Sequence, residues 1–282
     1  MFKTLIDPVT LADHLDDSTW VVIDCRFDLA EPPKGEQLYF DAHIPAARYA
    51  HLDRELSGEK TGGNGRHPLP TVEQMRARFG ALGIGAGTQV VVYDADSGLH
   101  ASRLWWMLRF MGHEAVALLD GGFARWVGEG RPTRSGPEVS TPAVFTGTPH
   151  EDWRLDAAAV EKGLNDPGQL LVDARAEPRF RGEDEPLDPQ AGHIPGARNY
   201  FFQRNLTDDK TFRSADDLRR DWLALLAGTP PEQAVMYCGS GVTACHNLLA
   251  LEHAGLGGAR IYPGSWSEWS SDPHRPTATG SD

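Results

Sequence analysis

The sequence predicts an α/β protein made of two tandem domains, each with a mostly parallel central sheet flanked by helices. Two observations carry this prediction. Short apolar runs alternate with helical patterns in both halves of the chain, which favours a parallel sheet covered by helices. Landmarks of the first half also recur in the same order in the second half. Repetition at such a long period indicates a pair of domains rather than a solenoid, and 282 residues suffice for two hydrophobic cores.

The duplication is visible in four pairs of segments. Each pair shares its apolar pattern and its polar ending, and the order is the same in both halves. The matched segments are residues 20–26 with 170–175, 41–46 with 191–196, 90–94 with 234–238, and 119–126 with 262–269.

The elements follow from these patterns. Residues 21–24, 90–93, 170–173 and 234–237 are short apolar runs that end at polar residues, as buried strands do. Residues 101–111 place apolar side chains at helical spacing. Residues 243–253 form a second helical pattern that ends near Gly255, a typical helix terminator.

A stretch rich in glycine, proline, serine and threonine separates the two halves at residues 128–153. Such composition is typical of a linker. We therefore expect an N-terminal domain at 1–130, a linker at 131–152 and a C-terminal domain at 153–282.

The most informative residue is Cys238, which follows the strand pattern at 234–237. Gly239 and Gly241 allow the backbone to fold closely around the sulfur. Backbone N–H groups of such a loop can converge on one point, and the helix that follows adds the positive end of its dipole. This setting favours the nucleophilic thiolate.

The alternative is a buried cysteine that only packs at a strand end. Three features favour the functional interpretation. Open α/β sheets place their sites at the carboxyl ends of strands. The loop is rich in glycine and hydroxyl groups, including Ser240 and Thr243, and it carries no large side chain that would shield the sulfur.

The segment Cys-Gly-Ser-Gly-Val-Thr-Ala at 238–244 resembles the active-site loop of the rhodanese superfamily, and most of all that of its 3-mercaptopyruvate sulfurtransferases. Further landmarks of that family are similar in residues 172–175, 179–180, 192–197 and 264–269. The resemblance therefore spans nearly the whole chain. It implies two rhodanese-like domains and sulfur transfer through a persulfide on Cys238.

The resemblance also implies roles for the loop and for one arginine. The N–H groups from Gly239 through Gly241 and Val242 to Thr243 would hold the anionic persulfide. Arg179 matches the arginine that binds the substrate carboxylate in this family, although it could also be a solvated surface residue.

Ser240 favours mercaptopyruvate over thiosulfate, because its hydroxyl could bond the carbonyl of the donor or relay a proton to the leaving enolate. The family proposal pairs this serine with a histidine and an aspartate of the first domain. His43 is the matching histidine, but His193 fills the same place in the second repeat, which favours a structural role for both. Asp28 and Asp41 are both candidates for the aspartate.

One departure leaves the donor open between 3-mercaptopyruvate and thiosulfate. Mercaptopyruvate sulfurtransferases typically show a second arginine after a Glu-Pro pair, whereas here Leu187 follows Glu185 and Pro186. The first domain carries Asp94 where the second carries Cys238, and a carboxylate cannot accept sulfur. We therefore expect the first domain to be catalytically silent.

Other functions are less favoured. A cysteine phosphatase needs Cys-x5-Arg, and Ala244 stands at the arginine position. A purely binding or carrier module would be expected to lose the cysteine, which is present. Cys25 and Cys245 are expected to pack, and the cysteines and histidines show no metal-ligand spacing.

Composition limits the partners. A formal net charge of −13 argues against nucleic acid and anionic membranes, which require a basic surface. The chain has no run of about 18 apolar residues, so it is not expected to span a membrane. Three cysteines are too few, and odd in number, for a disulfide framework. We expect a cytoplasmic enzyme without cofactor or metal that takes a small anionic sulfur donor. The resemblance implies a thiol acceptor such as thioredoxin, or cyanide.

Overall fold

The computed structural model describes residues 1–281, which divide into two compact units. The first unit contains Met1–Gly58, Pro70–His150 and Asp208–Phe212. The second contains Glu59–Leu69, Glu151–Thr207 and residues 213–281. Each unit therefore includes a short segment that lies between parts of the other in the sequence, and residues 59–69 belong with the unit that contains Cys238.

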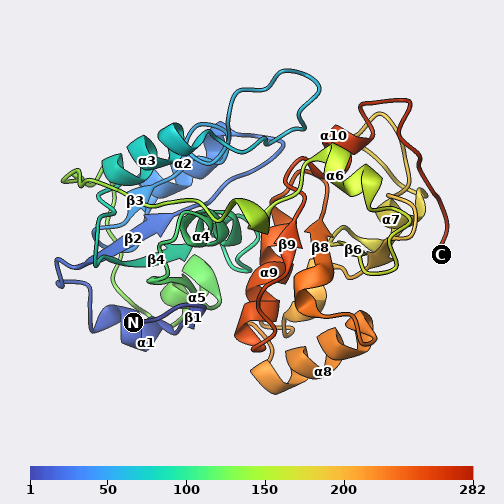
Figure 1. Ribbon diagram of the computed structural model, residues 1–282. Helices are drawn as coiled ribbons and strands as arrows, with labels where there is room; N and C mark the ends of the chain where they lie inside the picture. The colour runs from blue at the N-terminus through green and yellow to red at the C-terminus, as the bar shows by residue number, and fades with distance from the viewer. Residues whose placement is uncertain (282) are drawn as a thin grey trace. The chain divides into compact units, whose positions relative to one another are not determined.

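The first unit is built on a five-stranded sheet in the order β1-β5-β4-β2-β3, with every pair parallel. Val22 pairs with Val91, and Asp24 at the end of β2 pairs with Tyr93 at the end of β4. The strands are β1 (Leu5–Ile6), β2 (Trp20–Asp24), β3 (Arg48–Tyr49), β4 (Gln89–Tyr93) and β5 (Val116–Leu119) (Figure 1).

Helices cover this sheet. Leu11 of α1 and Trp126 of α5 share a core with Val22 and Val91 of the central strands. Helix α4 packs against β4 and β5, and all its residues are buried. The helices are α1 (Pro8–Ala12), α2 (Pro33–Asp41), α3 (Val72–Ala81), α4 (Ala101–Phe110) and α5 (Gly122–Gly128).

The second unit repeats the plan with four parallel strands in the order β7-β6-β8-β9. Asp173 at the end of β6 pairs with Tyr237 at the end of β8, as Asp24 pairs with Tyr93 in the first unit. The strands are β6 (Leu170–Asp173), β7 (Arg198–Asn199), β8 (Ala234–Tyr237) and β9 (Arg260–Ile261).

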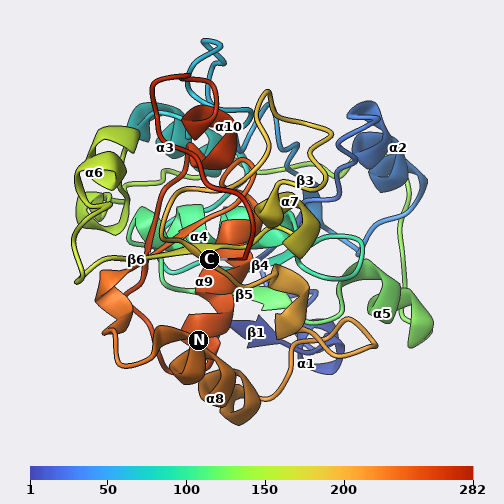
Figure 2. The ribbon, with the colours of Figure 1, turned by 90° about the vertical axis from the view of Figure 1, so that its right-hand side faces the viewer.

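One face of the second sheet packs on aromatic side chains. Trp266 and Trp269 of α10 share a core with Val235 and Tyr237 of β8. Helix α8 packs on α9, the helix that follows β8, as both views show (Figures 1 and 2). The helices are α6 (Ala157–Lys162), α7 (Glu177–Arg181), α8 (Ala215–Leu226), α9 (Thr243–His253) and α10 (Ser265–Trp269).

The predicted fold class is confirmed: both sheets are parallel and flanked by helices. The predicted strands at 170–173 and 234–237 coincide with β6 and β8, and the predicted helix at 243–253 coincides with α9. Residues 129–150, all of them described, contain no helix or strand apart from a bridge at Arg134. Within residues 1–281, no helix has the length and apolar character needed to cross a membrane.

Candidate active site

Cys238 lies directly after β8, in a loop whose carbonyl groups are held by α10. The Cys238 side chain is buried, with 2% of its surface exposed. The N–H of Trp266 donates to the Cys238 carbonyl, and the N–H of Ser267 donates to the Gly239 carbonyl, both at 2.9 Å. The N–H of Cys238 itself donates to Oγ of Ser265 at 3.1 Å.

These bonds orient the loop. In a planar trans peptide the carbonyl and the following N–H point in opposite directions. Because the Cys238 and Gly239 carbonyls point to α10, the N–H groups of Gly239 and Ser240 point away from it. Gly241 then takes a positive φ of 73°, which glycine adopts without strain. Val242 precedes α9 without a side-chain cap, and Thr243 begins the helix.

Ser240 is hydrogen-bonded to a histidine that the sequence did not indicate. Its Oγ lies 2.8 Å from Nδ1 of His67, and both side chains are buried. His67 belongs to segment 59–69, which the structure assigns to the same unit as Cys238. Ser240, two residues after Cys238, therefore forms a serine–histidine pair with a residue that is distant in the sequence.

His43, the histidine matched by the resemblance, has other partners. Its Nδ1 lies 2.8 Å from the Tyr39 carbonyl, and its Nε2 lies 3.5 Å from Glu138, all within the first unit. His193 makes the same contact in the second unit, with Nδ1 2.7 Å from the Phe180 carbonyl. This shared contact favours the structural role for His43.

The two candidate aspartates for His43 are also held elsewhere. Asp28 is paired with Lys34 at 2.9 Å, and Asp41 accepts a hydrogen bond from Gln37 at 2.8 Å.

Arg179 lies beside the cysteine loop, and a buried carboxylate fixes it. Its Nε and Nη2 donate to Glu185 at 3.2 Å and 2.6 Å, and Nη2 also contacts Asp188 at 3.2 Å. A methyl group added at Gly239 would lie 3.4 Å from Nη1 of Arg179. The guanidinium therefore borders the residue that follows the nucleophile.

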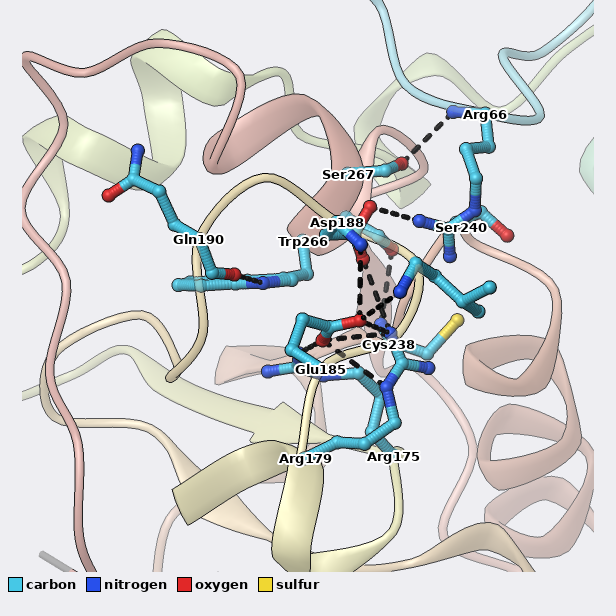
Figure 3. A network of polar contacts seen from close by, with 12 residues as sticks. Arg66, Arg175, Arg179, Glu185, Asp188, Gln190, Cys238, Ser240, Trp266 and Ser267 are labelled. Atoms are coloured by element: carbon cyan, nitrogen blue, oxygen red, sulfur yellow. Dashed lines mark hydrogen bonds and ion pairs between the residues drawn. The ribbon is translucent and has the colours of Figure 1, made fainter. Parts of the chain in front are cut away.

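A second guanidinium borders the same glycine. Arg66 pairs with Asp188 through Nη1, and its Nη2 would lie 2.7 Å from a methyl group at Gly239. Leu187 turns its side chain outward, with 45% exposed, and its N–H donates to Glu185 at 3.1 Å. Figure 3 shows Arg66 and Arg179 meeting at Asp188, with Glu185 beside Arg179.

The loop of the first unit is filled by a carboxylate instead. Asp94 follows β4 as Cys238 follows β8, and its oxygens accept three backbone N–H groups. Gly98, His100 and Ala101 donate to it at 2.9, 2.7 and 3.1 Å. The acidic side chain thus satisfies the donors that an incoming anion would need.

The other two cysteines are packed. Burial raises the pKa of the Cys25 thiol well above its ordinary value, which keeps it protonated. Cys245 is fully buried on α9, and its thiol donates to the Gly241 carbonyl at 3.4 Å. Within residues 1–281, no group of three or more His, Cys, Asp or Glu side chains could hold a metal ion.

The sequence and fold match known proteins over both units. The family model described as "Rhodanese-like domain" matches residues 7–129 and 156–272. The chain belongs to the rhodanese family. It is an enzyme, a sulfurtransferase with two rhodanese-like domains.

The relatives differ in the sulfur donor for which they are named. A Pseudomonas aeruginosa protein named "Probable 3-mercaptopyruvate sulfurtransferase" is 46% identical over 98% of each chain. The thiosulfate sulfurtransferase of Cricetulus griseus is 35% identical and covers 95% of this rhodanese and 92% of its own length. The solved 3-mercaptopyruvate sulfurtransferase of Leishmania major has a TM-score of 0.84 at 32% identity, over 95% of this chain and 74% of its own.

Proposed function

We propose that this enzyme transfers sulfur from 3-mercaptopyruvate to a thiol acceptor or cyanide, through a persulfide on Cys238. The observation that supports this choice of donor is the 2.8 Å contact between His67 and Ser240, which stands two residues after Cys238. This pair offers a proton and a hydrogen bond to a carbonyl oxygen, and mercaptopyruvate has such an oxygen.

The first half-reaction forms the persulfide. The Cys238 thiolate attacks the sulfur of mercaptopyruvate, an S–S bond forms, and the C–S bond breaks with its electron pair passing to carbon. The leaving group is the enolate of pyruvate, whose negative charge lies largely on the former carbonyl oxygen. Ser240 donates its one hydroxyl hydrogen to that oxygen, while its Oγ accepts a hydrogen bond from Nδ1–H of His67. A proton added at carbon completes pyruvate.

The loop then holds the product of this step. The persulfide is an anion once its terminal sulfur loses a proton. The N–H groups of Gly239 and Ser240 point away from α10, and those of Gly241, Val242 and Thr243 continue the loop into the helix N-terminus. Such fixed dipoles stabilise an anion without reorganising.

The second half-reaction regenerates the enzyme. An acceptor thiolate, as on thioredoxin, attacks the outer sulfur of the persulfide, and Cys238 leaves as thiolate. The acceptor becomes a persulfide, and a second thiol on it can release the sulfur as sulfide while a disulfide forms. Cyanide accepts the same sulfur and becomes thiocyanate.

Thiosulfate is the second candidate donor, because a relative with that name covers most of the chain. Its transfer releases sulfite, which needs no proton at carbon and no hydrogen bond to a carbonyl. The Ser240–His67 pair has no task in that reaction, which is why mercaptopyruvate is favoured.

The test is steady-state sulfur transfer to cyanide with each donor. We expect kcat/KM for mercaptopyruvate to exceed that for thiosulfate by tenfold or more, about 1.4 kcal/mol of transition-state preference. The variant Cys238→Ser should be inactive with both. A preference for thiosulfate would overturn the choice of donor, and no turnover with either would indicate a carrier or binding role.

A further inference from the structure

Each of the two guanidinium groups beside Gly239 keeps a terminal nitrogen unused, and the buried Nε of Arg66 also has no hydrogen-bond partner among residues 1–281. Arg66 uses Nη1 on Asp188, and Arg179 uses Nε and Nη2 on Glu185 and Asp188. Within residues 1–281, Nη2 of Arg66 and Nη1 of Arg179 have no hydrogen-bond partner. These are the nitrogens that would contact a methyl group at Gly239, at 2.7 Å and 3.4 Å.

We infer that Arg66 is the second arginine that binds the carboxylate of the donor, opposite Arg179, with Asp188 positioning both. This inference rests on the proposed function, since it needs a donor that carries a carboxylate. It explains how the enzyme binds such a donor although Leu187 stands where a second arginine was expected. The second arginine comes from segment 59–69 instead.

Asp188 is the residue that aligns the pair. Its side chain is 2% exposed, and each of its two oxygens contacts one of the arginines. Because Arg66 is anchored at Nη1 and Arg179 at Nε and Nη2, the remaining terminal nitrogen of each guanidinium has a fixed direction. Both donors lie close to the point where a side chain at Gly239 would begin, and two such donors match the two oxygens of a planar carboxylate.

The two arginines belong to a cluster in which positive and negative side chains are equal in number. Arg66, Arg175 and Arg179 face the three carboxylates of the cluster, so the cluster is formally neutral. Burial raises the pKa of Asp188, and the nearby Glu185 charge adds to this rise, whereas Arg66 and Arg179 lower it. Anion binding at the arginines favours proton uptake at Asp188, which would preserve the neutral balance.

The test compares two donors that differ only in the carboxylate. 3-Mercaptopyruvate carries it, and mercaptoacetone has a methyl group in its place but keeps the carbonyl and the sulfur. For Arg66→Ala and Arg66→Lys we expect KM for mercaptopyruvate to rise at least tenfold with kcat within threefold of wild type. Turnover of mercaptoacetone should be unchanged, which also shows that Ser240 and His67 remain in place.

Two further variants separate binding from structure. Arg220→Ala, on the exposed face of α8, removes the same charge outside the site and should leave both donors unaffected. In Arg66→Ala the Asp188 carboxylate loses one of its two arginine partners. The double variant Arg66→Ala/Asp188→Asn removes that negative charge as well. Recovery of KM in the double variant, or an equal loss with both donors, would show a structural role and overturn the inference.

A binding measurement keeps this test independent of turnover. Calorimetric titration with pyruvate, which retains the carboxylate, should show at least tenfold weaker binding to Arg66→Ala than to wild type. Unchanged pyruvate affinity would overturn the role of Arg66. A wild-type enzyme that binds pyruvate but transfers no sulfur from mercaptopyruvate would instead overturn the proposed function.

Discussion

Ser265 in the second unit and Gly122 in the first occupy matching positions and share a φ of +56°. Glycine adopts this left-handed conformation freely, whereas a residue with a side chain loses about 1–2 kcal/mol in it. Ser265 adopts this conformation and makes two hydrogen bonds: its Oγ accepts from the N–H of Cys238 and donates to the Tyr262 carbonyl. The strained serine thus stands in the unit that carries the nucleophile.

This relationship predicts an order of stability. Ser265→Ala keeps the strain and leaves the buried Cys238 N–H without a partner, so we expect it to lower the free energy of unfolding by about 1–3 kcal/mol. Ser265→Gly loses the same bond but relieves the strain, and should be about 1 kcal/mol more stable than the alanine variant. Urea denaturation measures both. An alanine variant as stable as the glycine variant would contradict the account.

The Ser240–His67 pair predicts a donor-dependent loss. With mercaptopyruvate, His67→Gln and Ser240→Ala should each lower kcat about 100-fold, in the range of general acid–base catalysis. Because the two act as a unit, the double variant should be little worse than either one. Thiosulfate turnover should change by less than tenfold.

Two histidine controls accompany this measurement. His274→Gln, at an exposed position, should change neither donor. His43→Gln should lower the melting temperature, because its ring is bonded to Tyr39, while the folded enzyme keeps its kcat. A loss of kcat in His43→Gln equal to that in His67→Gln would restore His43 as a catalytic candidate.

Gly239 predicts a change in donor affinity without a change in stability. The methyl group of Gly239→Ala would meet the guanidinium ends of Arg66 and Arg179 rather than backbone, so it would displace these side chains and leave the loop backbone in place. We expect kcat/KM to fall about tenfold as the guanidiniums are displaced, equal to about 1.4 kcal/mol. Gly63→Ala, where an added methyl meets nothing within 4 Å, is the matched control. Equal kinetics in both variants would show that Gly239 does not border the donor.

The central fold and the position of Cys238 after a strand were predictable because both depend on local sequence. Strands β6 and β8 are continuous apolar runs, and the loop after β8 is specified by its small residues. Parallel pairing then places Cys238 at the carboxyl end of the sheet. The strands with two residues, such as β3 and β7, carry too few side chains for any pattern.

His67 and Arg66 were not predictable in this way, because their position depends on which unit segment 59–69 joins. One signal was present in the repeat itself. His43 and Tyr93 are 50 residues apart (93 − 43), whereas His193 and Tyr237 are 44 apart (237 − 193). The first copy thus has extra residues in the interval that contains His67, and they include a run of glycines.

The Asp94 loop of the first unit is expected to affect stability alone. Asp94 accepts hydrogen bonds from three N–H groups, and in Asp94→Asn one carboxylate oxygen is replaced by an NH2 donor. We expect the free energy of unfolding to fall by about 1–3 kcal/mol, with kcat unchanged for the folded enzyme. Asp16→Asn, at an exposed position, is the control. A loss of sulfur transfer in a stably folded Asp94→Asn enzyme would show that the first loop takes part in the reaction.

Acidification should weaken the helix that follows the active-site loop. Burial lowers the pKa of His253, the last residue of α9, below its ordinary value of 6.5. The unfolded chain therefore binds this proton more readily than the folded one, and stability is lost as pH falls through 6.5 towards the folded pKa. This proton contributes at most about 1.4 kcal/mol per pH unit.

The measurement is urea denaturation of wild type and His253→Gln at several values between pH 7.5 and 5. Partial burial also lowers the pKa of His100 and His113, so the wild-type slope contains their share and the variant should be flatter but not flat. The exposed variant His274→Gln should keep the wild-type slope. If His253→Gln also kept it, the half-buried His253 imidazole would not be a source of the acid sensitivity, and the loss would have to come from the first unit, where His100 and His113 lie.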